Sequence, residues 1–344
     1  MTARSKNSGR TDRTGKAGSA GKPGHSRSAS NRSGRGPAAR GRNRFDGAPQ
    51  DAGGLPADAD AVESAFPVSS AEDAMPSPDG AGGPRAKKSL GQNFLRDRNI
   101  AAKIVAALRI GPEDRVIEIG PGPGALTRHI HAAGPAQLFL LEKDYHWATE
   151  HGRTRPAEPP VITPVLTDAL CFPWERLTPA RSWKVIGNLP YNVASPLMWD
   201  ILSMAPGLAR AVFMIQKEVG ERIVAAPGSG AYGALSVWLQ SFAVPRMEFI
   251  VPPQVFVPRP KVDSAVLSFV PLGPARGRFD PARLSRLLKV CFQQRRKQLQ
   301  RILRGYIAED VPALLSALGL DPAMRPENLA PEDFHMLSEA VKIP

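Results

Sequence analysis

The sequence predicts a doubly wound α/β fold with a Rossmann-like parallel sheet, followed by a small helical domain at the C-terminus. Three observations predict it. Near residue 120 a short apolar strand runs into a glycine-rich turn and then a helix. Further apolar segments follow, and polar residues stand at their C-terminal ends. Beyond Pro271 the composition changes to leucine-rich and arginine-rich stretches with helical periodicity.

The first 84 residues differ in composition from the rest of the chain. They contain 14 Gly, 8 Pro and 11 Ser, but only Leu55, Val62 and Val68 as branched aliphatic residues. Such a segment cannot bury enough apolar surface to offset its chain entropy, so we expect residues 1–84 to be disordered. Basic residues dominate its first 50 positions and acidic residues the remainder. Three roles stay open for it: a dispensable extension, an arm that holds RNA phosphates, and an organelle transit peptide.

Charge and composition narrow the classes of function. The formal net charge is +13, and the residues after Pro84 contribute +10 of it. This charge suggests a polyanionic partner, although a soluble basic protein without one would fit it equally well. No apolar run approaches eighteen residues, and the N-terminus lacks the apolar core of a secretory signal. Cys171 and Cys291 are too few for a disulfide framework or a cysteine zinc site. We therefore expect a cytoplasmic protein with no membrane contact and no metal.

The first expected helix precedes the glycine-rich turn. Asp97 or Asn99 can cap its N-terminus, and apolar residues recur every four positions from Ile100 to Leu108. Gly111-Pro112 should end it.

The turn itself follows a buried strand over Arg115–Ile119. Its pattern is Gly-x-Gly-x-Gly, from Gly120 to Gly124, whereas dinucleotide binders carry Gly-x-Gly-x-x-Gly. Glycines let the backbone approach a ligand closely. The turn contains no lysine for a triphosphate, and Glu118 beside it suits a ligand with an ammonium and a sulfonium group. The turn therefore predicts S-adenosylmethionine as cofactor, with a purely structural glycine turn as the alternative.

Three more strands are expected, and each leads into polar residues. They span Gln137–Glu142, Val161–Leu166 and Trp183–Ile186. Glu142 stands 22 residues after Gly120, where a carboxylate can accept both hydroxyls of a ribose. Asp168 follows the third strand and Asn188 the fourth. Because open α/β sheets bind ligands at the carboxyl ends of their strands, these residues predict a single site.

A stiff tetrapeptide, Asn188-Leu189-Pro190-Tyr191, ends the fourth strand and is the predicted catalytic element. The Asn188 side-chain oxygen and the Leu189 carbonyl can accept the two hydrogens of an exocyclic amine, which localises the nitrogen lone pair. The Tyr191 ring can stack on a base, which contributes about 1–3 kcal/mol. The pattern fits in-line methyl transfer to N6 of adenine, with alignment and electrostatics carrying the rate. A strand-end turn with an asparagine cap is the structural alternative.

Eight ordered segments together closely resemble the KsgA-type bacterial small-subunit rRNA adenine dimethyltransferases. They are Lys88–Leu95, Glu118–Thr127, Gly187–Asn192, Gln216–Val219, Ala231–Val237, Pro258–Val266, Gln293–Lys297 and Arg325–Leu329. The resemblance covers essentially all of 85–344 and none of 1–84. It implies a class I S-adenosylmethionine-dependent methyltransferase. Such an enzyme transfers four methyl groups to two adjacent adenines near the 3′ end of 16S rRNA, on a maturing small subunit.

The resemblance also implies roles for the cofactor residues. Asn93 and Leu95 should help to close over S-adenosylmethionine, and Gly120 should contact its methionine part. Glu142 would hold the ribose and Asp168 the adenine amine.

On the substrate side the resemblance implies a pocket for the target base. Asn188 would join it to the cofactor site. Phe256 resembles a second aromatic wall opposite Tyr191, unless it is a core phenylalanine that anchors its loop.

The C-terminal helices are the expected RNA-binding surface. We expect one helix over Pro281–Arg304 with an apolar stripe and eight basic residues, including Arg295, Arg296 and Lys297. Shorter helices should follow near Val311–Leu318 and Pro331–Val341. The predicted organisation is a tail over 1–84, a methyltransferase domain over 85–271 and a helical RNA-binding domain over 272–344, acting as a monomer.

Several alternatives to this function remain. Erythromycin-resistance methylases acting on 23S rRNA share the Gln-Asn-Phe element and a related tetrapeptide, and DNA adenine methylases and the mitochondrial transcription-factor relatives are further possibilities. The Asn-Leu-Pro-Tyr-Asn sequence and Val262–Val266 favour the KsgA type. A ribosome-assembly factor that acts mainly by binding is the rival from another class.

Overall fold

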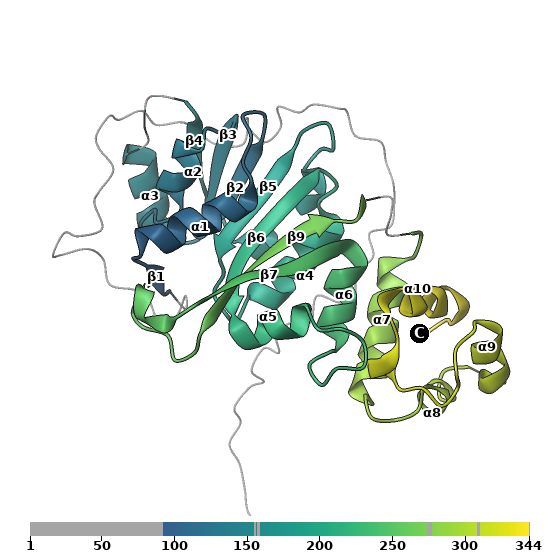
Figure 1. The fold of residues 1–344 in the computed structure, drawn as a ribbon. Coiled ribbons are helices and arrows are strands. Elements are labelled where there is room, and N and C mark those ends of the chain that lie inside the picture. The colour runs from purple at the N-terminus through teal and green to yellow at the C-terminus, as the bar shows by residue number, and fades with distance from the viewer. Residues whose placement is uncertain (1–91, 155, 157–158, 274–276, 308–309, 344) are drawn as a thin grey trace, which may run out of the picture. The chain divides into compact units, whose positions relative to one another are not determined.

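A seven-stranded mixed sheet forms the centre of the protein in the computed structural model, which describes residues 92–154, 156, 159–273, 277–307 and 310–343 (Figure 1). The strands are β2 (Arg115–Ile119), β3 (Gln137–Glu142), β4 (Val161–Leu166), β5 (Trp183–Asn188), β6 (Leu208–Gln216), β7 (Ala243–Val251) and β9 (Ser264–Pro271). Their order in the sheet is β4-β3-β2-β5-β6-β9-β7. The predicted tail of residues 1–84 lies outside the described residues.

The sheet confirms the predicted doubly wound topology. β2 pairs in parallel with β3 on one side and with β5 on the other. The strands from β2 to β4 are added in one direction and those from β5 onward in the other, so the direction of winding reverses between β2 and β5. That reversal opens a crevice at the carboxyl ends of these strands, where ligands bind in such folds. β9 runs antiparallel between β6 and β7. The first three strands have the predicted bounds, and β5 continues two residues beyond its predicted end.

Helices cover both faces of the sheet (Figure 1). They are α1 (Arg98–Leu108), α2 (Thr127–Ala132), α3 (Tyr145–Thr154), α4 (Ala194–Met204), α5 (Lys217–Ile223) and α6 (Ala234–Phe242). Because strand side chains alternate between faces, β2 contributes Val116 to the apolar layer under α1 and α2, and Ile117 to the layer that includes α4 and α6. This two-faced packing explains why the strands are almost continuously apolar.

The start of α1 is as predicted, but its end is not. The Asp97 carboxylate accepts hydrogen bonds from the backbone N–H groups of Asn99 and Ile100. The helix ends at Leu108, because Arg109 adopts a left-handed conformation with φ of 57°. The predicted stop at Gly111-Pro112 therefore lies beyond the true helix end.

A second, two-stranded sheet joins distant parts of the chain. β1 (Phe94–Leu95) pairs antiparallel with β8 (Phe256–Val257), and Leu95 lies opposite Phe256. The segment before α1 is thereby fastened to the loop between β7 and β9.

The C-terminal region contains α7 (Pro281–Gln293), α8 (Leu299–Leu303), α9 (Val311–Ala317) and α10 (Pro331–Ala340). The single helix predicted over Pro281–Arg304 is wrong, because a turn at Gln294–Gln298 divides it. After this turn the Leu299 N–H donates to the Met324 carbonyl, and α8 buries its apolar residues. The two shorter helices are confirmed.

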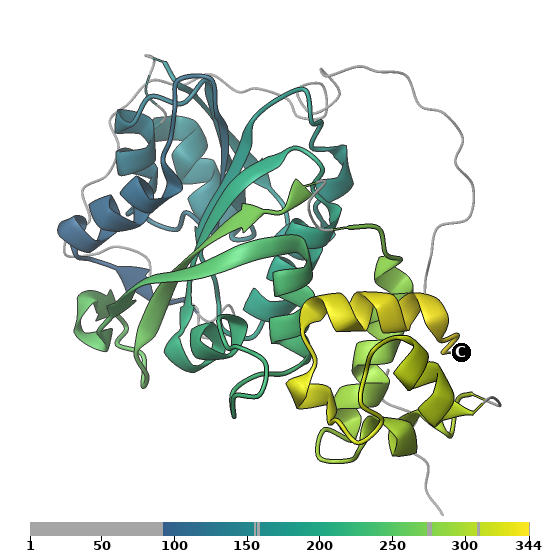
Figure 2. The same ribbon diagram turned by 45° about the vertical axis from the view of Figure 1, so that its right-hand side comes forward.

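Of these helices, α7 and α10 pack against α6, and Figure 2 shows the C-terminal helices from a second side. His335 of α10 and Ser241 of α6 are hydrogen-bonded, with 2.7 Å between the ring Nε2 and the hydroxyl oxygen. Among the described residues, no helix is long and apolar enough to cross a membrane.

Candidate active site

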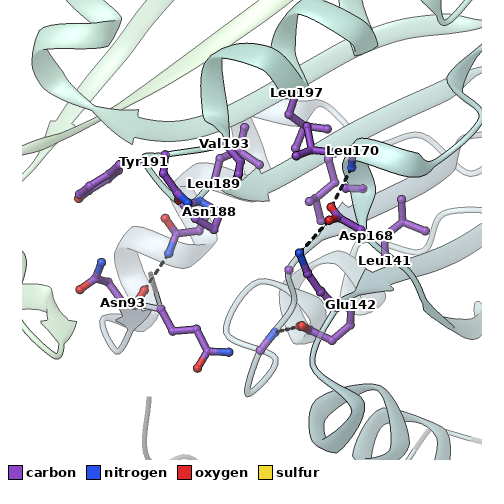
Figure 3. Close-up of a pocket in the computed structure, with 18 of the residues that line it drawn as sticks. Asn93, Leu141, Glu142, Asp168, Leu170, Asn188, Leu189, Tyr191, Val193 and Leu197 are labelled. Atoms are coloured by element: carbon purple, nitrogen blue, oxygen red, sulfur yellow. Dashed lines mark hydrogen bonds and ion pairs between the residues drawn. The ribbon is translucent and has the colours of Figure 1, made fainter. Parts of the chain in front are cut away.

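A cavity opens at the carboxyl ends of β2, β3, β4 and β5 (Figure 3). With the space at its mouth it encloses about 1060 Å³. It brings together most of the predicted site residues: Asn93, Gly120, Glu142, Asp168, Asn188, Leu189, Pro190 and Tyr191. The predicted Leu95, Phe256, Arg295, Arg296 and Lys297 do not line it.

The glycine turn forms one wall and needs its glycines. Gly120, Gly122 and Gly124 have φ values of 64°, 50° and 80°, a region that side chains with a Cβ rarely adopt. A Cβ built on Gly120 meets nothing within 4 Å, so open space lies over this residue. A Cβ on Gly122 would stand 3.0 Å from the Phe94 ring. The turn therefore leaves open space over Gly120 and packs tightly under Phe94 at Gly122.

Glu142 is buried at the end of β3 and is held by two backbone groups. Its Oε2 accepts from the Gly122 N–H at 3.1 Å, and its Oε1 accepts from the Asp144 N–H at 2.8 Å. Burial raises the pKa of Glu142 above its usual range, and these two hydrogen bonds oppose the increase. Each oxygen keeps a further lone pair, so the fixed carboxylate can accept two more hydrogen bonds from a ligand.

Asp168 lines the cavity two residues beyond the end of β4. Its Oδ1 accepts from the Leu170 N–H at 3.0 Å, which starts a short 3₁₀ turn. Its Oδ2 accepts from the Lys143 ammonium at 2.8 Å. The hydrogen bond to Asp168 raises the pKa of Lys143. Sequence reasoning missed Lys143, although its position directly after Glu142 was a usable signal.

Glu118 does not line the cavity, which corrects the argument that this acid meets the ligand. It points toward α2, where the Thr127 hydroxyl donates to its Oε2 at 2.7 Å. Complete burial raises its pKa to about 8, with a smaller contribution from the charge of Glu142. At neutral pH Glu118 is therefore mostly protonated and contributes little negative charge to the site.

Asn188 faces the segment before α1. Its Nδ2 donates to the Asn93 backbone carbonyl at 2.9 Å, as the dashed line in Figure 3 shows. This bond identifies the nitrogen side of the amide and leaves the Oδ1 atom as an acceptor. The two residues are 95 positions apart in the sequence, and Asn93 directly precedes β1, which pairs with β8.

The rest of the tetrapeptide is rigidly held. The Leu189 N–H donates to the Met214 carbonyl of β6, and the Pro190 carbonyl accepts from Val193 and Ala194 at the start of α4. The Tyr191 hydroxyl lies 3.1 Å from the hydroxyl of Ser264, which is buried at the start of β9. The ring of Tyr191 is thus anchored at its far end while it borders the cavity.

Leu95 and Phe256 form part of the core instead of the cavity wall. They are 6% and 2% exposed, lie opposite each other in the β1–β8 pair, and belong to the apolar layer that includes α1 and α2. Phe256 is therefore the core phenylalanine that anchors its loop, and the aromatic residue that lines the cavity beside Asn93 is Phe94. The sequence pattern alone did not show that Phe94 lines the cavity whereas Leu95 is buried in the core.

The three basic residues that were predicted to contact RNA lie in different environments. Arg295 is half-buried, and its guanidinium donates to the Glu327 carboxylate at 2.7 Å and to the Gly230 carbonyl at 2.8 Å. The Arg295 guanidinium thus links the segments that contain Glu327 and Gly230. Arg296 and Lys297, which follow it in the turn between α7 and α8, are exposed.

The sequence matches the family described as ribosomal RNA adenine dimethylase over residues 83–342. This chain belongs to that family. The family member is 70% identical over 258 residues to Ribosomal RNA small subunit methyltransferase A of Nitratidesulfovibrio vulgaris strain Hildenborough, covering 75% of this chain and 97% of the relative. It is 66% identical to the protein of the same name from Oleidesulfovibrio alaskensis, over 76% of this chain and 93% of the relative.

Solved structures agree with the family assignment. This rRNA adenine dimethylase family member resembles a dimethyladenosine transferase from Plasmodium falciparum with a TM-score of 0.62 and 25% identity, over 71% of this chain and 95% of that one. It resembles the 23S rRNA methyltransferase ErmE with a TM-score of 0.55 and 27% identity, over 72% and 99% of the two chains. The predicted class I methyltransferase fold is confirmed.

Proposed function

We propose that this chain transfers methyl groups from S-adenosylmethionine to N6 of two adjacent adenines near the 3′ end of 16S rRNA. The product is N6,N6-dimethyladenine in the maturing small ribosomal subunit. The family match, and relatives at 66–70% identity that carry the name small subunit methyltransferase, support an enzyme of this substrate class.

The residues that line the cavity fit S-adenosylmethionine in their chemistry. The open space over Gly120 suits the methionine part, the fixed Glu142 carboxylate suits two ribose hydroxyls, and Asp168 suits an amino group on the base. When bound, S-adenosylmethionine supplies a methyl group on a positively charged sulfur, so no metal or strong base is needed to activate it.

The observation that carries the proposal is the fixed orientation of the Asn188 amide. Because its Nδ2 donates to Asn93, its Oδ1 is available to accept from an adenine N6 hydrogen. The Leu189 carbonyl can accept from the other hydrogen, since the next carbonyl, that of Pro190, is bonded to the start of α4. Together the two acceptors localise the lone pair of N6 and hold it toward the cofactor cavity. Such alignment lowers the barrier without a general base.

The target adenine must leave any base stack to reach Asn188. Tyr191, anchored through Ser264, supplies a ring on which the base can stack. Phe256 is buried in the core and does not line the cavity, so the proposal does not assign it as a second wall.

We further propose that residues 85–271 act as the methyltransferase domain and residues 272–344 as an RNA-binding domain, in a monomer that works in the cytoplasm. The exposed charges of Arg296 and Lys297 support phosphate contacts by the second domain. The tail at 1–84 lies outside the described residues, and its role stays a prediction.

The test uses purified full-length chain, methyl-labelled S-adenosylmethionine and immature small subunits. We expect label in dimethyladenine that maps to 16S rRNA. Label confined to 23S rRNA or DNA would contradict the substrate, and tight subunit binding without any transfer would favour the assembly-factor alternative.

Asn188→Ala should abolish transfer while leaving subunit binding largely intact. Thr149→Ala, which removes an exposed hydroxyl on α3 remote from the tetrapeptide, is the control. Undiminished turnover by Asn188→Ala would remove the tetrapeptide from the mechanism.

A further inference from the structure

The inward face of α3 carries a buried histidine that the proposed mechanism does not use. His151 is 4% exposed, and its Nε2 lies 2.8 Å from the backbone carbonyl oxygen of Gly122 in the cofactor turn. A carbonyl oxygen can only accept, so Nε2 carries the hydrogen and donates it. Burial lowers the pKa of His151, which favours the neutral ring over the charged one.

The Gly122 carbonyl needs this donor. It belongs to the peptide that joins Gly122 to Pro123, and its hydrogen bond with His151 is buried. A buried carbonyl without a partner is costly, and the chain would relieve that cost by rotating the peptide. His151 is therefore positioned to keep the turn in one orientation.

Gly122 is held on its other sides as well. Its N–H donates to the Glu142 carboxylate at 3.1 Å, and the Phe94 ring covers the position of a Cβ. Phe94 in turn meets the ring of Trp147 edge-on, with 5.8 Å between centroids. Trp147 lies one helical turn before His151 on α3, so the same helix supports Gly122 through two routes.

We propose that His151 is a positioning residue for the cofactor: by holding the Gly122 carbonyl it keeps the Gly122 N–H directed at Glu142, and so aims that carboxylate at the ribose. This rests on the proposed cofactor site. His151 does not line the cavity, so in this proposal it acts through Gly122 and Glu142.

The test measures binding of S-adenosylhomocysteine to the full-length chain by calorimetry, without any transfer reaction. His151→Leu fills the buried position with a side chain of moderate size but removes the hydrogen-bond donor. It should weaken the binding of S-adenosylhomocysteine about tenfold, the effect of losing one hydrogen bond. His151→Gln offers an Nε2 donor at the corresponding atom and should restore binding to within about threefold of wild type. Thr154→Val is the matched control, because it removes a hydrogen bond within the same helix, from the Thr154 hydroxyl to the Glu150 carbonyl.

A second ligand separates positioning from general damage to the fold. The 2′-deoxyribose analogue lacks one hydroxyl that Glu142 would accept. If His151 acts through Glu142, removing that hydroxyl should weaken binding to wild type more than binding to His151→Leu. Equal losses in both proteins, wild-type affinity in His151→Leu, or the same weakening in Thr154→Val would each overturn the proposal. If wild type itself fails to bind S-adenosylhomocysteine, the proposed cofactor site fails and the inference with it.

Discussion

Replacing Glu118 with Gln should stabilise the folded protein, and the gain should grow as the pH rises. Glu118 is completely buried and its pKa is raised from 4.5 to about 8, so the folded chain holds a proton that the unfolded chain releases. For an acid with a raised pKa, stability is highest below the unfolded pKa and is lost as pH rises toward the folded one. Glutamine carries no such proton, and its oxygen can still accept from the Thr127 hydroxyl.

The magnitude follows from the two pKa values. One pKa unit corresponds to about 1.4 kcal/mol, so at pH 7.5 keeping Glu118 protonated costs the folded state about 4 kcal/mol relative to the unfolded chain. At pH 5 the same cost is about 1 kcal/mol. The difference in stability between Glu118→Gln and wild type should thus increase by about 3 kcal/mol across this range.

Thermal unfolding at pH 5.0, 6.2 and 7.5, followed by circular dichroism, measures this change. A difference of about 3 kcal/mol corresponds to about 6–12 °C in Tm for a domain of this size. The new amide also places an N–H₂ group in a buried site, but that cost is the same at every pH. The change of the Tm difference with pH therefore isolates the proton on Glu118.

Parallel Tm curves for wild type and Glu118→Gln would refute the reasoning, because they would mean that Glu118 is ionised in the folded chain. Thr127→Val supplies an independent check. The Thr127 hydroxyl lowers the Glu118 pKa by donating to it, so its removal should make the decline of stability with pH steeper.

Three further predictions concern stability and RNA binding. Burial raises the pKa of Asp114, but its hydrogen bonds and the charge of Lys184 outweigh burial, so the pKa is lowered overall. Asp114→Asn should therefore lower Tm at pH 7.5 and lower it much less at pH 4. An equal loss of Tm at both pH values would contradict this. Phe256→Ala should cost about 3–5 kcal/mol in urea unfolding, and a loss under about 1 kcal/mol would argue against its core position. Replacing Arg296 and Lys297 together by Ala should reduce the salt dependence of subunit binding by about two charges without lowering Tm, and an unchanged salt slope would exclude phosphate contacts.

Local sequence determined the elements whose causes are local. The strands Arg115–Ile119 and Gln137–Glu142 have their predicted bounds, because a short, mostly apolar segment between turn residues specifies a strand buried on both faces. Asp97 caps α1 because a side chain can reach N–H groups two and three residues ahead. The positive φ of Gly120 is one that its residue type permits without strain.

Tertiary structure decided which side chains meet. Asn188 was predicted from its motif, but its partner Asn93 lies 95 positions earlier in the sequence. Phe256 is buried in the core and pairs with Leu95 between β1 and β8. Arg295 looked like one of several equal charges along a helix, yet Glu327 pairs with it at the break between α7 and α8.

The sequence by itself therefore determined the first four strands of the large sheet, the glycine-rich cofactor turn and the Asn188–Tyr191 element, since these depend on residues within a few positions of one another. Only the tertiary structure decided that Glu118 is buried and protonated, that Lys143 meets Asp168, and that α3 supports the glycine turn. Burial and long-range hydrogen bonds depend on which faces of the sheet and helices come together. The residues next to a side chain in the sequence do not show which faces come together around it.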